Sequence, residues 1–199
     1  MYRKYIYLYI LIIIVFNIIL FYNYKSIKET FGTINKGFNT FHVINILQRD
    51  DTIESLNNTR TECNKMGISS NKIGYGNNLI AIIENAINNN YKNTVVIETG
   101  FKFTQSKELI KKRLEEFLNR FGNDWDVLQL SSSTNTNENN TVNIYPGLDS
   151  VTNAPISGAY IINSSIFQKL KDSITNNNIN NIQKESKWYL FNPQCGKIN

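Results

Sequence analysis

A short run of β-branched residues that ends in an acidic side chain places the strongest constraint on this sequence. Residues 94–97 are Thr-Val-Val-Ile, and Glu98 follows them directly, two positions before Gly100. A run of this length and composition predicts a strand that is buried on both faces. Open α/β sheets place their chemistry at the carboxyl ends of such strands. We therefore expect Glu98 at the rim of a pocket, with a capping or solvated role at the strand end as the alternative.

Helical and strand patterns alternate on both sides of this run. Apolar residues recur at helical spacing in three segments, and Ser106 and either Asn77 or Asn78 are suitable N-caps for two of them. Asp51 is the N-cap expected for the first helix, and Ser164 or Ser165 is expected to cap a short fourth one. The expected strands are 41–47, 94–98, 126–130 and 157–162, and the expected helices are 52–66, 79–87, 107–121 and 165–170. This alternation predicts an α/β domain with a mostly parallel sheet.

The N-terminal residues predict a membrane anchor. From Tyr5 to Tyr22 the only clearly polar residue is Asn17, and about 18 apolar residues are enough to cross a hydrocarbon core. No small-residue cleavage site follows the run, which favours an uncleaved anchor over a signal peptide. We therefore expect a tail and transmembrane helix over residues 1–24, a stalk over 25–40 and a single domain over 41–199. The expected localisation is a single-pass membrane protein whose domain is lumenal or otherwise extracytoplasmic.

Charge and cysteine usage exclude some classes of partner. The formal charge is +5 and the pI about 9.1, but the lysines are spread along the chain, with no arginine cluster and no run of five or more like charges, so we expect no nucleic-acid partner. Cys63 and Cys195 are the only cysteines, and no C-x-x-C or Cys/His cluster is present to bind a metal. A disulfide between the two in an oxidising compartment and two separate buried thiols remain the alternatives.

Four segments in order resemble one family of sugar transferases. They are Val43-Ile44-Asn45-Ile46 with Arg49 after it, Gly74 with the helix that follows, Asp124-Trp125-Asp126-Val127-Leu128-Gln129-Leu130, and Gly158-Ala159-Tyr160-Ile161-Ile162. Together they resemble the glycosyltransferase family 25 domain, which includes lipooligosaccharide sugar transferases and collagen galactosyltransferases. The resemblance runs from Phe41 to about Leu170. It implies a single nucleotide-sugar-transferase-like (GT-A-like) domain, a nucleotide-sugar donor, and a glycan or protein acceptor.

The metal motif of that family is altered in this chain. The family pattern is Glu-Asp-Asp, two residues and Phe, and the matching residues here are Glu98, Thr99, Gly100 and Phe103. Mn²⁺ and Mg²⁺ prefer carboxylate oxygens, whereas Thr99 offers a neutral hydroxyl and Gly100 only backbone. The sequence therefore predicts no tight metal site, and the use of a cofactor is left open.

The resemblance assigns roles to individual residues. Glu98 and Asp126 are the candidate catalytic acids, and Arg49, Lys102 and Asn45 are the candidate substrate-binding residues. Arg49 or Lys102 would replace part of the missing metal charge on the diphosphate. The alternative for each is a solvated side chain at the surface.

Three hypotheses remain at this point. One is a membrane-anchored glycosyltransferase-like protein with reduced or no activity. The second is a catalytically inactive pseudo-glycosyltransferase that acts as a binding or scaffolding subunit, and the third is a purely structural surface protein. Whether the chain is an enzyme is left open. Trp188 and Tyr189 either form an aromatic platform for a sugar or base, or pack the C-terminal segment onto the core.

Overall fold

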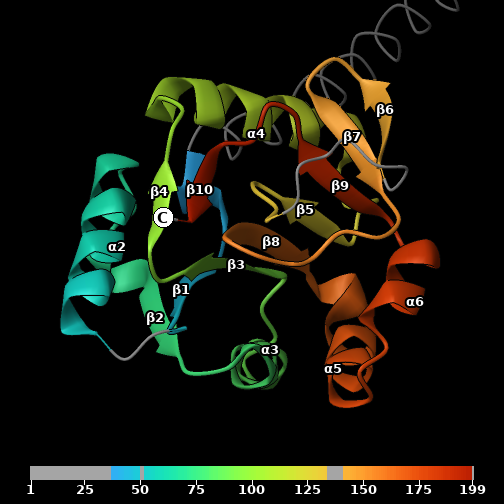
Figure 1. Ribbon diagram of the computed structural model, residues 1–199, viewed down its shortest axis with the longest axis horizontal. Coiled ribbons are helices and arrows are strands. Elements are labelled where there is room, and N and C mark those ends of the chain that lie inside the picture. The colour runs from blue at the N-terminus through green and yellow to red at the C-terminus, as the bar shows by residue number, and fades with distance from the viewer. Residues whose placement is uncertain (1–36, 50–51, 134–140, 199) are drawn as a thin grey trace, which may run out of the picture. The chain divides into compact units, whose positions relative to one another are not determined.

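Eight strands form one mixed sheet at the centre of the chain (Figure 1). The computed structural model describes residues 37–49, 52–133 and 141–198, which belong to a compact unit that spans Gly37–Asn199. In their order across the sheet, the strands are β2 (Ile73–Gly76), β1 (Val43–Leu47), β3 (Asn93–Glu98), β8 (Ala159–Asn163), β5 (Val127–Gln129), β9 (Trp188–Phe191), β7 (Leu148–Val151) and β6 (Thr141–Tyr145). A second, two-stranded sheet pairs β4 (Phe101–Phe103) with β10 (Gly196–Ile198).

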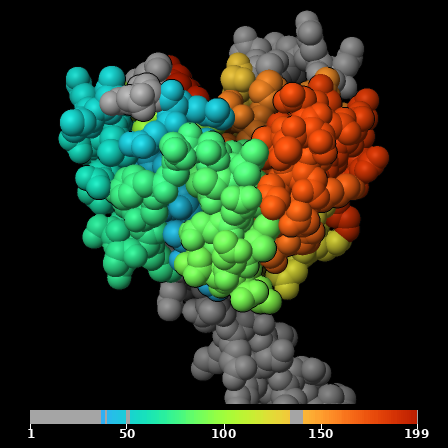
Figure 2. Space-filling view, turned by 90° about the horizontal axis from the view of Figure 1, so that it is seen from below, coloured from blue at the N-terminus to red at the C-terminus, as the bar shows by residue number. Residues whose placement is uncertain are grey.

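Helices cover both faces of the large sheet. One apolar cluster joins one face to α2 and α4, and a second joins the opposite face to α3, α5 and α6. Figure 2 views the molecule from the α3 and α5 side, where the green surface of α3 lies beside the orange surface of α5. The helices are α2 (Ile53–Lys65), α3 (Leu79–Asn88), α4 (Lys107–Phe121), α5 (Phe167–Thr175) and α6 (Ile179–Lys184). The α/β prediction is confirmed.

The caps of α3 and α4 confirm the sequence prediction. The side chains of Asn78 and Ser106 accept hydrogen bonds from backbone amides three residues further on, and each satisfies one amide that the first helical turn leaves unpaired. The other two caps differ from the prediction. Thr52 is the N-cap of α2, whereas Asp51 lies outside the described residues. Asn163 caps the 3-10 turn Ser164–Ile166 before α5, and neither Ser164 nor Ser165 has this role.

The sheet is less parallel than the sequence predicts. Only three neighbouring pairs within the described sheet, β1–β2, β1–β3 and β5–β9, are parallel. The difference arises chiefly because β8 runs antiparallel to both β3 and β5, its neighbours at the centre of the sheet. The strand that contains Tyr160 was predicted correctly, but an apolar strand that is buried on both faces carries no sequence signal for its direction.

The helices that the structure describes contradict the expected localisation as a single-pass membrane protein. Over residues 37–49, 52–133 and 141–198, no helix has both the length and the apolar character needed to cross a bilayer. The predicted tail and anchor over residues 1–24, and the predicted stalk as far as residue 36, lie outside the described residues.

Two open alternatives from the sequence are resolved by packing. Trp188 and Tyr189 are buried in β9, between β5 and β7, and therefore belong to the core and form no exposed platform. Cys63 and Cys195 are free thiols in the cluster against α2 and α4. Burial raises the pKa of each thiol to about 12, so both remain protonated at neutral pH.

Candidate functional site

An ion pair joins the ends of two neighbouring parallel strands. Arg49 lies just after β1 and Glu98 ends β3, and the register that pairs Leu47 with Glu98 brings the two side chains together. Arg49 Nη2 is 2.7 Å from Glu98 Oε1. The Glu98 side chain is 3% exposed and that of Arg49 56% exposed, so the carboxylate is buried while the guanidinium still reaches solvent. The hydrogen bond to Glu98 raises the pKa of Arg49.

The other carboxylate oxygen of Glu98 is also occupied. Glu98 Oε2 accepts a hydrogen bond of 3.1 Å from the backbone N–H of Gly158, the residue before β8. Gly158 has a φ of +79°, and a Cβ at this position would clash with Ser131 Oγ. Glycine is required here for both reasons, the backbone conformation and the close approach. The sequence resemblance included Gly158, but nothing in the sequence indicated its contact with Glu98.

The residues after Glu98 are committed to structural hydrogen bonds. Thr99 Oγ1 accepts from the backbone N–H of Arg49 at 3.0 Å, and the N–H of Gly100 donates to Thr59 Oγ1 of α2 at 3.1 Å. A divalent cation in this loop would need several oxygen ligands. Both oxygens of Glu98 and the hydroxyl of Thr99 already accept hydrogen bonds from protein groups. The residues of this loop therefore do not fit the metal of the family motif, and no described group of three or more His, Cys, Asp or Glu offers another metal site.

A cavity of about 770 Å³ opens beside Arg49, and we call it the α3 cavity. It lies on the sheet face that α3, α5 and α6 cover. Its apolar walls come from the start of α3, the end of α5, the start of α6 and the loop between β7 and β8, and several carboxamide side chains also line it. The lining residues are Gln48, Arg49, Asn77, Asn78, Leu79, Ile80, Asn153, Ala154, Pro155, Ile156, Ile174, Ile179 and Asn180. The volume falls in the range typical of small-molecule and cofactor sites.

Asn45 and Lys102 do not join this cavity. The Asn45 side chain is buried within the sheet, where Nδ2 donates to Thr94 Oγ1 at 2.9 Å. Lys102 is an exposed residue of β4 and lines a smaller cavity between the start of α2 and the turn at Gly100. Of the three predicted substrate-binding residues, only Arg49 lines the α3 cavity, and Glu98 lies behind it as its buried ion-pair partner.

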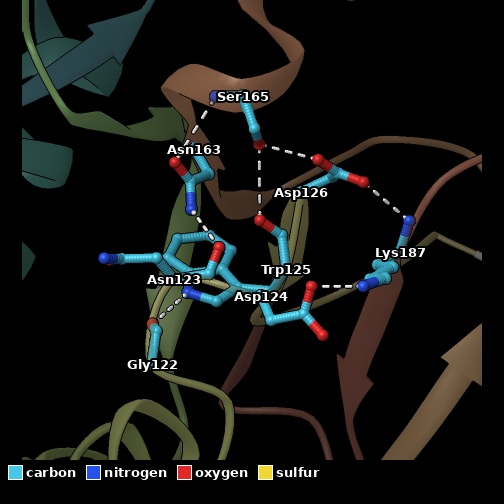
Figure 3. A network of polar contacts seen from close by, with 8 residues as sticks. All are labelled: Gly122, Asn123, Asp124, Trp125, Asp126, Asn163, Ser165 and Lys187. Atoms are coloured by element: carbon cyan, nitrogen blue, oxygen red, sulfur yellow. Dashed lines mark hydrogen bonds and ion pairs between the residues drawn. The ribbon is translucent and has the colours of Figure 1, made fainter.

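Asp126 and Glu98 lie at opposite ends of the strands, Asp126 where β5 begins and Glu98 where β3 ends. Asp126 precedes β5, at the end where the parallel strands begin, and both of its oxygens accept hydrogen bonds (Figure 3). Ser165 Oγ donates to Oδ1 at 2.7 Å, and the backbone N–H of Lys187 donates to Oδ2 at 2.8 Å. Asp126 thus joins the beginnings of β5 and β9 to the turn before α5. The structure does not bring the two predicted catalytic acids together.

Comparisons with known proteins yield only distant likenesses. No protein-family model matches the chain, and no curated protein sequence matches it. A UDP-glucose pyrophosphorylase solved with UDP-glucose matches with a TM-score of 0.44 and 12% identity, over 78% of this chain and 74% of that one. A putative glucose-1-phosphate thymidylyltransferase from Bacillus anthracis has a TM-score of 0.42 and 17% identity, over 81% of this chain and 75% of that one.

A third solved structure is a glycosyltransferase involved in glycosylation of the major capsid of PBCV-1. Its TM-score is 0.36 and its identity 10%, over 68% of this chain and 66% of that one. Similarities this low establish neither the family of the chain nor its ligand.

Proposed function

We propose that this protein binds a nucleotide sugar in the α3 cavity without a divalent cation. In this proposal it is a glycosyltransferase-like protein of the family 25 type, with reduced or no transfer activity. The observation that carries the proposal is Arg49, which lines the cavity while the buried carboxylate of Glu98 holds its guanidinium in place. The four sequence segments that resemble family 25 support the sugar-transferase assignment and imply a glycan or protein acceptor.

The charges at the cavity would allow it to bind a diphosphate without a divalent cation. A divalent cation held by two carboxylates forms a site with no net charge. Arg49 and Glu98 form a neutral pair in the corresponding place, and the exposed part of the guanidinium presents further N–H donors to the cavity. The N-terminus of α3, which also lines the cavity, adds partial positive charge. A diphosphate is therefore expected to lie between Arg49 and the first turn of α3.

The cavity walls suit the remainder of a nucleotide. Leu79, Ile156 and Ile174 present apolar surface of the kind that packs against a nucleobase. Asn77 and Asn153 present carboxamides, which donate and accept hydrogen bonds at a base edge or ribose. This combination of apolar walls with a few polar groups is typical of small-molecule sites.

An inactive binding protein is the second candidate function. Transfer requires stabilisation of the negative charge that develops on the leaving diphosphate. Arg49 is already hydrogen-bonded to Glu98, and both oxygens of Glu98 are occupied, which favours ligand binding over rapid transfer. We expect the full chain to release little nucleoside diphosphate from a bound nucleotide sugar. Rapid release that Glu98→Gln abolishes would contradict this candidate and favour a working transferase.

Isothermal titration of the full chain with a panel of UDP-, GDP- and CDP-sugars tests the proposal. We expect saturable binding of at least one ligand, with the same affinity in EDTA and in Mn²⁺. Arg49→Met is expected to weaken that binding about tenfold or more, because a charge-assisted hydrogen bond to phosphate is lost. Arg49→Lys retains the charge and is expected to bind with intermediate affinity.

Arg120→Met is the matched control. Arg120 stacks on Tyr145 beside a different cavity, which is formed by α4 and the turn between β6 and β7. Its removal lowers the net charge of the protein by the same amount and should leave ligand affinity unchanged. Far-UV circular dichroism of each variant checks that it is folded. A folded wild-type protein that binds no member of the panel, or one that binds only with Mn²⁺, would refute the proposal.

A further inference from the structure

A row of polar side chains continues from the ion pair towards the centre of the sheet. Tyr160 of β8 lies opposite Val96 of β3, and Gln129 of β5 lies opposite Tyr160. Val96 and Glu98 are two residues apart on one strand and therefore face the same side. Glu98, Tyr160 and Gln129 thus occupy three adjacent strands on the side of the sheet that contains the α3 cavity. Directly opposed residues on neighbouring strands have Cβ atoms about 4.5–5.5 Å apart.

The inner two members of this row have unsatisfied polar atoms. Tyr160 and Gln129 are both 0% exposed. Tyr160 Oη, Gln129 Oε1 and Gln129 Nε2 have no hydrogen-bond partner among the residues that the structure describes. Most buried polar groups in proteins are paired, and leaving one unpaired lowers stability. Nearby Gln183, which is equally buried, makes two hydrogen bonds to Ala154. Tyr160 and Gln129 contribute three of the five buried side-chain polar atoms that have no partner in the described structure, and only theirs lie on facing positions of two adjacent strands, which points to a missing binding partner.

The environment of Tyr160 keeps its hydroxyl protonated. Burial raises the pKa of Tyr160, and the negative charge of Glu98 raises it further, while the positive charge of Arg49 acts in the opposite direction. The phenol therefore remains both a hydrogen-bond donor and an acceptor at every physiological pH. Gln129 adds one donor group and one acceptor. This set of groups matches sugar hydroxyls, each of which donates and accepts.

We propose that Tyr160 and Gln129 form an inner subsite that hydrogen-bonds the hydroxyl groups of the sugar in the bound nucleotide sugar. The inference rests on the proposed function. Ala154 both lines the α3 cavity and packs in the apolar cluster that contains Tyr160. Access to the subsite from the cavity requires the loop around Ala154, which Gln183 holds by two hydrogen bonds, to move aside when the ligand binds. The diphosphate remains near Arg49, and the sugar extends towards the centre of the sheet.

The test compares Tyr160→Phe and Gln129→Met in the full chain. Each variant removes unpaired polar atoms with little change in volume, so we expect the melting temperature to rise by about 2–4 °C. We also expect nucleotide-sugar affinity to fall about fivefold or more, because hydrogen bonds to the sugar are lost. Affinity for the corresponding nucleoside diphosphate, which has no sugar at its β-phosphate, should change by less than about twofold.

Tyr189→Phe is the matched control, because Tyr189 lies on the opposite face of the same sheet. It should leave both affinities unchanged. A lower melting temperature in Tyr160→Phe and Gln129→Met would show that the two side chains hold structural water, and would overturn the subsite. Unchanged sugar affinity would overturn the subsite while leaving the proposed function intact. If the wild type binds neither nucleotide sugar nor nucleoside diphosphate, both the proposed function and the subsite are refuted.

Discussion

Glu98 and Asp126 are both carboxylates at strand ends, yet their surroundings give them different roles. Glu98 is paired with the partly exposed Arg49 at the rim of the α3 cavity, where a ligand can reach the guanidinium. Asp126 accepts hydrogen bonds from Ser165 and Lys187 at the opposite end of the strands. Glu98 is the last residue of β3, whereas Asp126 comes just before the first residue of β5. Because both oxygens of Asp126 accept hydrogen bonds that join neighbouring elements, we infer a structural role for Asp126.

The substitution Asp126→Asn tests that structural role. An Asn side chain has only one acceptor oxygen, so one of the two donors, Ser165 Oγ or the N–H of Lys187, loses its hydrogen bond to residue 126. We expect the free energy of unfolding to fall by about 1–2 kcal/mol, because the side chain is partly buried. Ligand affinity at the α3 cavity should not change. Urea unfolding and titration with the nucleotide-sugar panel measure the two quantities.

Asp124→Asn serves as the control for Asp126→Asn. Asp124 is exposed and contacts the side chain of Lys187, an ion pair at the surface. Exposed ion pairs of this kind contribute little to stability, so this variant should unfold at nearly the same urea concentration as the wild type. Loss of ligand affinity in Asp126→Asn alone, with stability unchanged, would contradict the structural role and restore Asp126 as a site residue.

At the scale of the elements, a side chain of α6 holds in place the loop that forms one wall of the α3 cavity. The buried side chain of Gln183 accepts from the N–H of Ala154 at 2.9 Å and donates to its carbonyl at 2.6 Å. A carboxamide that pairs with both backbone groups of one residue fixes that residue much as a neighbouring strand would. The geometry of the cavity wall therefore depends on a residue nearly thirty positions further along the chain.

Replacement of Gln183 by Leu should destabilise this loop. The substitution leaves the N–H and C=O of Ala154 unpaired, and we expect a loss of about 2–4 kcal/mol in the free energy of unfolding. Hydrogen exchange of the amides in residues 152–157 should accelerate, since the loop opens locally more often. Mass spectrometry of the exchanged protein, together with urea unfolding, measures both effects.

Gln168→Leu provides the comparison for this experiment. Gln168 makes one exposed hydrogen bond to Asp172 along α5, and such pairs contribute only a few tenths of a kcal/mol. Its replacement should leave exchange in residues 152–157 unchanged. Equal exchange rates in Gln183→Leu and the wild type would mean that the loop is held by packing and not by Gln183.

The elements that could be predicted from the sequence are those with their own local signals. The helices α3 and α4 combine an apolar stripe with an N-cap, and β1, β3, β5 and β8 are apolar runs. Strands without such signals were not predicted, namely β2, which contains two glycines, and β6 and β7, which form the last hairpin of the sheet. Nor was β9 predicted, because the aromatic residues around Trp188 gave no period to distinguish a central strand from a packed terminus.

The candidate site could be predicted only in part for the same reason. Arg49 and Glu98 each follow a predicted strand, so a parallel pairing of those strands was enough to bring them together. Gln129 and Tyr160 are different, because they meet only through the antiparallel placement of β8 between β3 and β5. A polar residue inside the apolar run 127–130 was the one available signal for Gln129. The direction of β8 could not be inferred from its own residues.

In the unit that the structure describes, a single sheet contributes side chains to two apolar clusters, one on each of its faces. The two tryptophans of the chain lie in different clusters, Trp125 against Phe117 of α4 and Trp188 on the side of α3, α5 and α6. Both are almost fully buried, with exposed fractions of 3% and 0%. Each face of the sheet therefore contains one intrinsic fluorescent probe of its own packing. Because the strands between the clusters contribute side chains to both, neither cluster can be lost without disrupting the other.

We therefore expect the two faces to unfold together. With excitation that is selective for tryptophan, Trp125→Phe reports on Trp188 alone and Trp188→Phe on Trp125 alone, so each variant reports on one cluster. Within each variant, the urea midpoint from fluorescence should coincide with that from far-UV circular dichroism, as in a two-state transition. Comparison within one variant removes the effect of the substitution itself on stability. If the fluorescence of Trp188 changed at lower urea than the circular dichroism, the face with α3, α5 and α6 would unfold separately, and the α3 cavity would be lost before the rest of the fold.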